Sequence, residues 1–294
     1  NIVGDNAVSV GGTAATTTLL ATIDASTSSG GVTIDQNVDL TSTANVTLGT
    51  AADTLTLDIL TESNVVVNAG EHATTDTGVN DTLALAGANN QGLTVVDLSS
   101  TTDQVTQING AVNSAAITNF ENITLSGLTG SQTASITGSD EANVIIATAN
   151  ADTIVAGKGA DTITMGDGVD TVLGGAGDDI FVVTAIADIK GTTHIEDTIT
   201  GGDGTDTLVV DTAQTTKLPL VTSIENLKLK IADADDLDAT TGSANATIDT
   251  SVISSVNNII LDLDTGAATD AGTITISKLD SGDTVTIDAL ATDT

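Results

Sequence analysis

Apolar and polar residues alternate with a period of two over short stretches along most of the chain. Clear examples are 54–58 (TLTLD), 64–67 (NVVV), 94–97 (TVVD), 123–125 (ITL), 273–276 (TITI) and 284–287 (TVTI). A period of two places every second side chain on the same face of a strand, and Val and Thr suit a half-buried pleated surface. Helical periodicity is nearly absent, so the pattern predicts an all-β chain.

Between residues 138 and 182 a longer period of nine residues appears, in five units that follow one another without a gap. The units read GSDEANVII, ATANADTIV, AGKGADTIT, MGDGVDTVL and GGAGDDIFV. Each has small or polar residues at its second and fourth positions, Asp or Asn at its sixth and an apolar residue at its eighth. We expect the eighth residues to form a core: Ile145, Ile154, Ile163, Val172 and Phe181.

The residue types of these units suit a tight turn that binds a hard cation. Glycine at the second and fourth positions permits positive φ, which lets six residues turn with their carbonyl oxygens pointing inward. The Asp at position six adds a carboxylate. Calcium takes six to eight oxygen ligands at about 2.3–2.6 Å, more than one turn supplies, so two turns must share one ion.

Two units make one coil, so alternate turns should stack on the same edge. The expected pairs are 156–161 with 174–179 and 147–152 with 165–170. Stacked strands lie about 4.8 Å apart, which would bring Asp161 near Asp179 and Asp152 near Asp170. Two carboxylates at that spacing repel by about 1 kcal/mol in water and by several times as much in an interior-like medium. We therefore expect the coil to open without a cation.

The pattern is the glycine-aspartate nonapeptide of calcium-binding β-helices, so the chain resembles the RTX (repeats-in-toxin) family of secreted bacterial proteins. The resemblance implies that backbone carbonyls of two stacked turns join two Asp carboxylates around each Ca²⁺. The best-formed site would then use Ala156, Gly157, Lys158, Gly159, Asp161, Gly174, Gly175, Ala176, Gly177 and Asp179. A second, weaker site would use Asp152, Met165, Gly166, Asp167, Gly168 and Asp170, and a third would involve Asn143.

A further complete unit, GGDGTDTLV, occupies residues 201–209. The stretch 183–195 before it offers no glycine at a turn position and has Lys190 where a core residue belongs. We interpret this stretch as an excursion, after which the chain closes one more calcium turn. The candidate ligands in this part are Asp197, Gly202, Gly204 and Asp206.

These patterns predict a right-handed parallel β-roll or β-solenoid with calcium-binding turns, flanked by Thr- and Val-rich β-solenoid or β-sandwich regions. The expected parts are a Thr-rich β region at 1–137, the calcium-binding β-roll at 138–209 and a C-terminal β region at 210–294. Phe120 and Phe181 are the two aromatic residues of the chain. The core should therefore be thin and aliphatic.

Composition limits the partners. The net charge is −34, with six Lys and no Arg, so nothing basic could neutralise the phosphates of a nucleic acid. An anionic membrane surface is disfavoured for the same reason. The mean hydropathy of +0.23 is too high for a disordered acidic chain. We expect a protein that folds with calcium present.

The sequence has no cysteine, so calcium would take the cross-linking role of disulfides. Residues 1–20 lack the pattern of a secretory signal peptide, and no apolar stretch is long enough to span a bilayer. RTX proteins generally leave through a type I channel with an uncleaved C-terminal signal. The resemblance therefore implies an extracellular or cell-surface location without membrane insertion.

A second repeat links two segments, TNFENITLS at 118–126 and TSIENLKLK at 222–230. Each follows an Asp-Thr-Leu element, at 81–83 and 206–208. This alternation in a Thr-rich β chain resembles the crystalline surface-layer (S-layer) proteins of the RTX group. The segments also fit two plain strands, each with a buried Phe120 or Ile224 and a hydrogen-bonded Glu.

Support for catalysis is slight, and we expect no enzyme activity. His72 and His194 stand neither in an HExxH motif nor beside residues that would complete a triad. Arg, Trp, Tyr and Cys, which often bind sugars or phosphates or act as nucleophiles, are absent. Paired carboxylates are too abundant here to indicate a glycosidase.

Three functions stay open. We favour a calcium-dependent extracellular structural protein that self-assembles into an S-layer or related filament, with itself as main partner and a cell-surface polysaccharide as a second candidate. The alternative is the calcium-binding secretion and folding module of a secreted RTX enzyme or adhesin. An ice-binding adhesin ranks last, because the Thr row at the seventh positions is short and split between two edges.

Overall fold

The computed structural model describes most of the chain. The described residues are 7–11, 20–35, 40–58, 65–70, 80–90, 92–113, 115–183, 197–210, 220–231, 245–249, 255–263, 273–277, 279 and 281–289. All regular structure in these ranges is β-strand, as the sequence predicts. The excursion at 183–195, apart from Val183, lies outside the described residues, as do Lys190, His72 and His194.

The chain divides into two compact units, Asn1–Ile154 and Val155–Thr294. The division falls within β15 (Thr153–Lys158). The part boundaries that we drew at 137/138 and 209/210 follow the repeats, and they stay predictions. Each unit is described by itself below.

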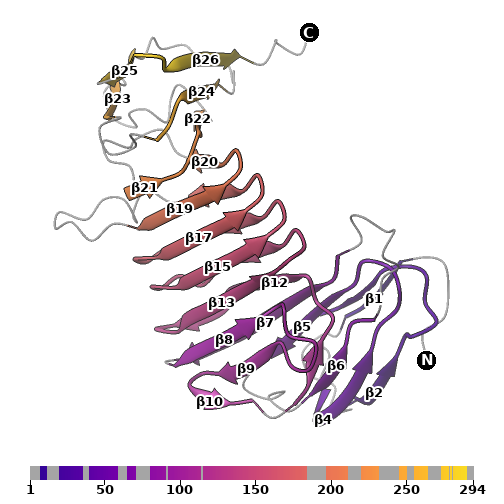
Figure 1. Ribbon diagram of the computed structural model, residues 1–294. Coiled ribbons are helices and arrows are strands. Elements are labelled where there is room, and N and C mark those ends of the chain that lie inside the picture. The colour runs from indigo at the N-terminus through magenta and orange to yellow at the C-terminus, as the bar shows by residue number, and fades with distance from the viewer. Residues whose placement is uncertain are drawn as a thin grey trace. The chain divides into compact units, whose positions relative to one another are not determined.

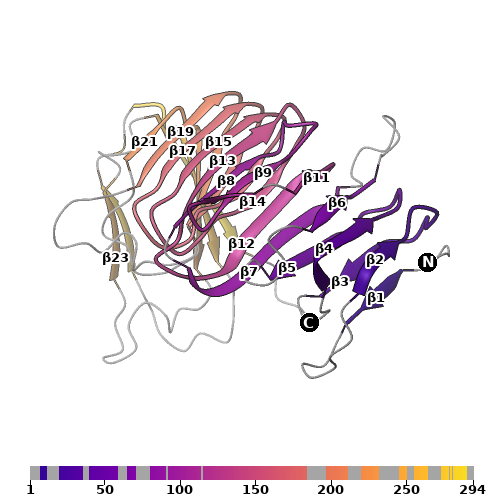
Figure 2. The same ribbon diagram turned by 90° about the horizontal axis from the view of Figure 1, so that it is seen from below.

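The N-terminal unit contributes strands to three sheets (Figure 1). The first has the order β1 (Val8–Val10), β3 (Val32–Ile34), β5 (Thr54–Asp58), β7 (Thr82–Asn90), β12 (Asn122–Gly130) and β14 (Val144–Ile146). The second has β10 (Ala111–Val112), β9 (Val105–Ile108), β8 (Leu93–Asp97) and β13 (Thr133–Ser139). The third has β11 (Ile117–Thr118), β6 (Val66–Asn68), β4 (Leu40–Thr47) and β2 (Leu20–Asp24), of which β2, β4 and β6 lie side by side in Figure 2.

Neighbouring strands of the first and third sheets are parallel, as in a β-solenoid. The register aligns one inward row across the first sheet, formed by Ile34, Leu55, Leu83, Ile123 and Ile145. These side chains are at most 1% exposed. The short period of two thus becomes a continuous aliphatic core, because parallel in-register pairing keeps every apolar position on one face.

One part of this unit departs from the parallel pattern. Strands β8, β9 and β10 pair antiparallel. Asn109 and Gly110 join β9 to β10, and both have positive φ, 52° and 77°. An Asn-Gly pair in this conformation is the favoured two-residue hairpin turn. The Asn-Gly pair is thus the sequence signal for this hairpin, which the period of two does not reveal.

The C-terminal unit also consists of stacked parallel strands. One sheet has β16 (Thr162–Thr164), β18 (Ile180–Val183), β20 (Thr207–Val210), β22 (Asn226–Ile231), β24 (Asn258–Leu263) and β26 (Thr284–Ala289) in that order. A second has β15, β17 (Thr171–Ala176), β19 (Thr198–Asp203) and β21 (Leu220–Thr222), and β23 (Asn245–Asp249) pairs with β25 (Thr273–Ser277). Figure 1 shows β17, β19 and β21 as successive rungs.

The core of this unit is a second aliphatic row with one aromatic ring. Ile163, Phe181, Leu208, Leu227 and Ile259 are in register on successive strands, and each is at most 1% exposed. The prediction that the eighth residue of every nonapeptide points inward is confirmed for all five units. The fold is therefore a parallel β-solenoid in which the nonapeptides supply regular coils.

The coil length changes where the nonapeptides are interrupted. Asp161 and Asp179 occupy equivalent places 18 residues apart, which is two nonapeptides. The next equivalent pairs, Asp170 with Asp197 and Asp179 with Asp206, are 27 residues apart. The coil that contains 184–196 is thus nine residues longer, yet the strands on either side stay in register.

Candidate calcium sites

Three turns of the C-terminal unit stack on one edge: 156–161, 174–179 and 201–206. A Cβ at Gly175 would overlap the carbonyl oxygen of Gly157, and one at Gly202 would overlap that of Gly175. The same holds at the fourth position, where Gly177 lies against the carbonyl oxygen of Gly159. The predicted stacking of 156–161 on 174–179 is confirmed, and the approach is close enough to exclude any side chain.

Glycine is needed at these places for a second reason. The second and fourth residues of the four complete turns all have φ between 88° and 139°, a region that residues with a Cβ rarely adopt. These residues are Gly157, Gly159, Gly166, Gly168, Gly175, Gly177, Gly202 and Gly204. The sequence argument that positions two and four must turn with positive φ is therefore confirmed.

The sixth residues form a ladder of buried carboxylates. Asp161, Asp179 and Asp206 are at most 1% exposed. The N–H of Asp161 donates to Asp179 Oδ1 at 2.9 Å, and the N–H of Asp179 donates to Asp206 Oδ1 at 2.8 Å. The carboxylates of Asp179 and Asp206 thus each accept the backbone N–H of the rung before, which partly offsets the expected repulsion between neighbouring aspartates.

The second oxygen of each carboxylate has a different environment. Asp179 Oδ2 and Asp206 Oδ2 are buried and have no hydrogen-bond partner among the described residues. Each points at the first glycine of its own turn, Gly174 or Gly201. A buried carboxylate oxygen without a donor is costly. A cation in the turn would remove that cost, so these residues fit a calcium site.

The electrostatics agree with this geometry. Burial raises the pKa of Asp179, against the lowering effect of the Asp161 N–H. Burial also raises the pKa of Asp206 to about 6, and the neighbouring charges of Asp179, Glu225 and Asp178 add to the shift. Without a cation, the ladder therefore holds negative charge in a place that disfavours it.

Three turns of the N-terminal unit close differently, through the protein's own donors. In each, the side chain at position six accepts the backbone N–H of position two, four residues earlier. The bonds are Thr148 N–H to Asp152 Oδ2 (2.8 Å), Ser139 N–H to Asn143 Oδ1 (2.7 Å) and Gly49 N–H to Asp53 Oδ2 (2.9 Å). The Thr148 hydroxyl adds a bond to Asp152 Oδ2 at 2.9 Å. Protein donors therefore occupy the place that a cation would take.

The described turns fall into two kinds with different needs. In the turns with Gly175 or Gly202 at position two, where φ is positive, Asp179 Oδ2 and Asp206 Oδ2 have no hydrogen-bond partner among the described residues. Turns in which Thr148 or Ser139 holds position two satisfy the polar side chain internally. A positive φ at position two thus goes together with a carboxylate oxygen that is left for a cation.

The predicted ligands are distributed as follows. The structure brings together all ten residues of the best-formed site, from Ala156 to Asp161 and from Gly174 to Asp179, on two stacked turns. Gly202, Gly204 and Asp206 stack on them as a third turn. Met165, Gly166, Asp167, Gly168 and Asp170 form a turn on the other edge, where the Asp170 N–H donates to Asp197 Oδ1 at 2.8 Å.

The remaining candidates lie in the N-terminal unit. Asp152 is buried, and burial raises its pKa to about 6 against the lowering effect of the Ala134 and Thr148 donors. Asn143 is also buried, and its amide donates to the Glu121 carbonyl at 2.7 Å. Metal ligation by these two residues stays a prediction, and the bonds they already make weigh against it.

The sequence did not reveal a second carboxylate ladder in the N-terminal unit. The Val32 N–H donates to Asp53 Oδ1 at 2.6 Å, and the Asp53 N–H donates to Asp81 Oδ1 at 2.7 Å. The Asp81 N–H then donates to Glu121 Oε2 at 2.7 Å. The repeated Asp-Thr-Leu and apolar-Glu-Asn elements were the signal, since they mark the rungs of this ladder.

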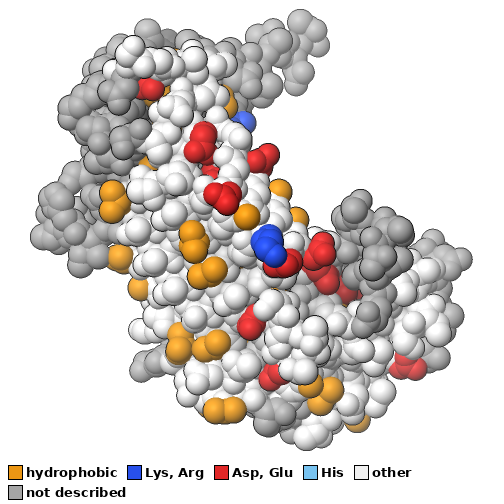
Figure 3. Space-filling view, viewed as in Figure 1, with side chains coloured by type: hydrophobic (Ala, Val, Ile, Leu, Met, Phe, Trp, Pro, Cys, Tyr) orange, Lys and Arg blue, Asp and Glu red, His pale blue; other side chains and the backbone are white. Residues whose placement is uncertain are grey.

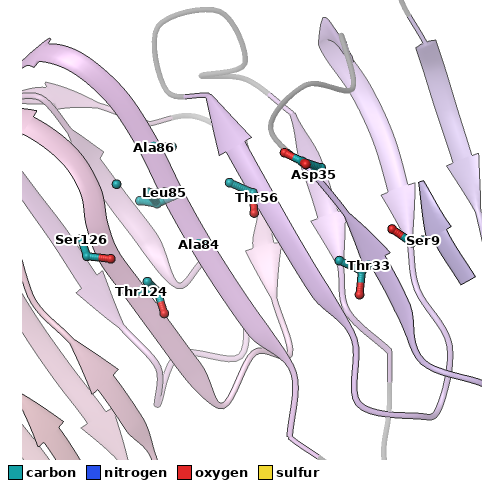
Figure 4. Close-up of a pocket in the computed structure, with 10 residues that line it drawn as sticks. Ser9, Thr33, Asp35, Thr56, Ala84, Leu85, Ala86, Thr124 and Ser126 are labelled. Carbon is teal, nitrogen blue, oxygen red and sulfur yellow. The ribbon is translucent and has the colours of Figure 1, made fainter. Parts of the chain in front are cut away.

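The same unit has a shallow hollow of about 440 Å³ on the outer face of its first sheet (Figure 4). It is lined by Ser9, Thr33, Asp35, Thr56, Ala84, Leu85, Ala86, Thr124, Ser126 and Gly127. Within the described ranges, no three His, Asp or Glu side chains gather in a metal-binding cluster. The described chain also has no helix with the length and apolarity needed to cross a bilayer.

Comparison with known proteins supports the calcium interpretation. The family model of the RTX calcium-binding nonapeptide repeat (4 copies) matches residues 137–172, 146–181 and 196–212. A search of curated proteins finds no match to the chain. The chain thus contains RTX calcium-binding nonapeptide repeats, which bind Ca²⁺ structurally and are typical of secreted extracellular bacterial proteins.

Proposed function

We propose that this chain is a calcium-dependent structural protein of the bacterial cell surface, which associates with copies of itself into an S-layer or related filament. Calcium would set the fold, because the Oδ2 atoms of Asp179 and Asp206 need a cation in place of a donor. Millimolar calcium outside the cell would fill the turns, whereas low cytosolic calcium would leave them unstable and the chain exportable.

The observation that supports the structural role is a regular row of polar side chains along the C-terminal unit. Thr207, Asn226, Asn258 and Thr284 follow one another in register on adjacent strands. Their side chains are joined by hydrogen bonds of 3.3, 3.2 and 3.0 Å. Such a row repeats at the strand spacing of about 4.8 Å. A periodic row of this kind can match the same row of a neighbouring chain.

Apolar side chains on the surface are spread out. Leu173, Ile180 and Leu220 of this unit are 39%, 40% and 52% exposed. Figure 3 shows the hydrophobic side chains of the drawn face as small scattered groups on a surface that is mostly neither hydrophobic nor charged. Contacts between copies would therefore be mainly polar, with isolated apolar contacts. Association through such contacts would depend on a backbone that is held in one conformation.

Negative-stain electron microscopy and sedimentation of the purified chain test this proposal. With calcium, we expect sheets or filaments, and after excess EGTA we expect them to dissolve with loss of β-sheet circular dichroism. A monomer in both conditions, with a calcium-dependent fold, would support the module of a secreted enzyme or adhesin instead. An unchanged β signal and intact assemblies in EGTA would overturn the calcium dependence itself.

A further inference from the structure

The calcium turns of the C-terminal unit end against a segment that lies outside the nonapeptides. Strand β21 pairs with β19, and β22 pairs with β20. The link between β21 and β22 is only Ser223, Ile224 and Glu225, in the place where the previous coil has the six-residue turn 201–206. The outer side of this last calcium turn therefore faces Ser223 and Glu225.

The Ser223 carbonyl takes the place that a repeat carbonyl holds one rung earlier. A Cβ at Gly174 would meet Asp179 Oδ2 and, at 2.7 Å, the carbonyl oxygen of Gly201. A Cβ at Gly201 would meet Asp206 Oδ2 and the carbonyl oxygen of Ser223. Gly174 and Gly201 thus face the same two groups, a position-six carboxylate oxygen and a carbonyl oxygen of the next rung. At Gly201 that carbonyl belongs to Ser223, which is not part of a nonapeptide.

The chain adopts an uncommon conformation to place this carbonyl. Ser223 has φ of 52°, in the left-handed region that residues with a side chain rarely occupy. Ile224 is fully buried and anchors the link in the core. The backbone conformation of Ser223 is therefore held by the packing of its neighbour Ile224, unlike that of a loop that contacts only solvent.

Two carboxylates meet at this end of the ladder. Asp206 is fully buried, and its Oδ2 has no hydrogen-bond partner among the residues that the structure describes. Its backbone N–H donates to Glu225 Oε2 at 2.8 Å. Asp206 Oδ2 and the Ser223 carbonyl thus lie against Gly201, the first residue of the turn, while Glu225 lies against Asp206, its last residue.

We propose that this end of the ladder is an additional divalent-cation site, in which Ser223 and Glu225 supply from outside the repeats the ligands that a further nonapeptide would supply. The expected ion is calcium, because all available donors are hard oxygens and the remaining ligands would be turn carbonyls and water. The inference rests on calcium binding by the turns. It adds Glu225 as a ligand at the end of the nonapeptides.

The N-terminal unit offers a matched control. Asn119, Phe120 and Glu121 repeat the arrangement, with Asn119 at φ 65°, Phe120 buried and Glu121 Oε2 accepting the Asp81 N–H at 2.7 Å. The sequence before Asp81 has Thr77 and Val79 where a calcium turn has glycines. Glu121 thus makes the same hydrogen bond without a glycine turn beside it.

The test compares Glu225→Gln with Glu121→Gln in the whole chain. Gln keeps an acceptor for the N–H but removes the charge. Bound calcium per chain would be counted after equilibrium dialysis, and affinities measured by isothermal titration calorimetry. We expect Glu225→Gln to lose one ion, or to bind it at least about tenfold more weakly because ligand charge sets calcium affinity, and Glu121→Gln to match the wild type.

Equal calcium counts and affinities in wild type and both variants would overturn this site while leaving the repeat sites intact. An equal loss in both variants would also overturn it, because the effect would then belong to the shared hydrogen bond. No calcium binding by the wild type would overturn the proposed function as well. If Glu225→Gln does not fold, anomalous scattering from wild-type crystals grown with calcium decides, and a peak beside Asp206 Oδ2 and the Ser223 carbonyl is the expected result.

Discussion

Replacing Asp179 by Asn should change stability in opposite directions with and without calcium. Asn keeps an oxygen that can accept the Asp161 N–H, and it removes the buried charge between the rungs of Asp161 and Asp206. Carboxylates about 4.8 Å apart repel by about 1 kcal/mol in water and about 3 kcal/mol at an effective dielectric constant of 20. In chelator, Asp179→Asn should therefore raise the free energy of unfolding by roughly 1–3 kcal/mol.

In calcium the sign should reverse. A site filled at about a hundred times its dissociation constant stabilises a protein by about 2.7 kcal/mol. The Asn variant would lose a charged ligand and much of that stabilisation. Denaturant unfolding followed by circular dichroism, once in EGTA and once in millimolar calcium, measures both differences.

Asp53→Asn is the control for this experiment. Its two carboxylate oxygens already accept the N–H groups of Val32 and Gly49. Asn can replace only one acceptor, so we expect a loss of about 1–3 kcal/mol that is the same in calcium and in EGTA. If Asp179→Asn instead destabilises equally in both conditions, Asp179 acts only as a hydrogen-bond acceptor, and the reasoning on the ladder is wrong.

Three further predictions concern single residues and pH. Gly177→Ala should abolish the rise in melting temperature that calcium causes, because φ is 139° and a Cβ would overlap the Gly159 carbonyl, whereas Gly11→Ala, with no atom within 4 Å of its Cβ, should leave that rise unchanged in calorimetry. Thr148→Val should lower the melting temperature equally with and without calcium, since its hydroxyl bonds Asp152 directly; a loss seen only in calcium would make Asp152 a ligand after all. Burial raises the pKa of Asp152 and Asp206 to about 6, above about 3.9 in the unfolded chain, so the fold binds extra protons between about pH 4 and pH 6 and loses stability as pH rises through that window. Calcium-free protein should therefore melt at a higher temperature at pH 5 than at pH 7, and the opposite order would contradict the assigned burial.

The nine-residue period predicted much of the C-terminal unit, because a fixed period assigns each residue to a turn, strand or core position. It placed Phe181 in the core, gave Gly175 a positive φ and set the turn 156–161 against 174–179. Each of these follows from local residue type and spacing. The 27-residue coil also fits the expected excursion, although the residues 184–196 lie outside the described part.

The sequence could not show which groups donate hydrogen bonds to the buried carboxylates. The bond from the Asp81 N–H to Glu121 spans 40 residues, and no local pattern states which backbone N–H reaches which side chain. The same limit applies to Thr148 and Asp152, where only the fold shows that a hydroxyl closes the turn. The antiparallel hairpin at Asn109 and Gly110 is a different case: alternation predicts a strand but not its direction, and the Asn-Gly pair is the local signal that does indicate the turn.

Hydrogen exchange followed by mass spectrometry on the intact chain, with calcium and with chelator, tests the calcium-set fold most directly. The account predicts that peptides carrying the amides of Asp161, Asp170 and Asp179 exchange slowly in calcium and quickly without it, because their acceptors are the ladder carboxylates. Peptides carrying the amides of Val32 and Asp53 should stay protected in both conditions. Equal protection of residues 156–206 with and without calcium would contradict the account.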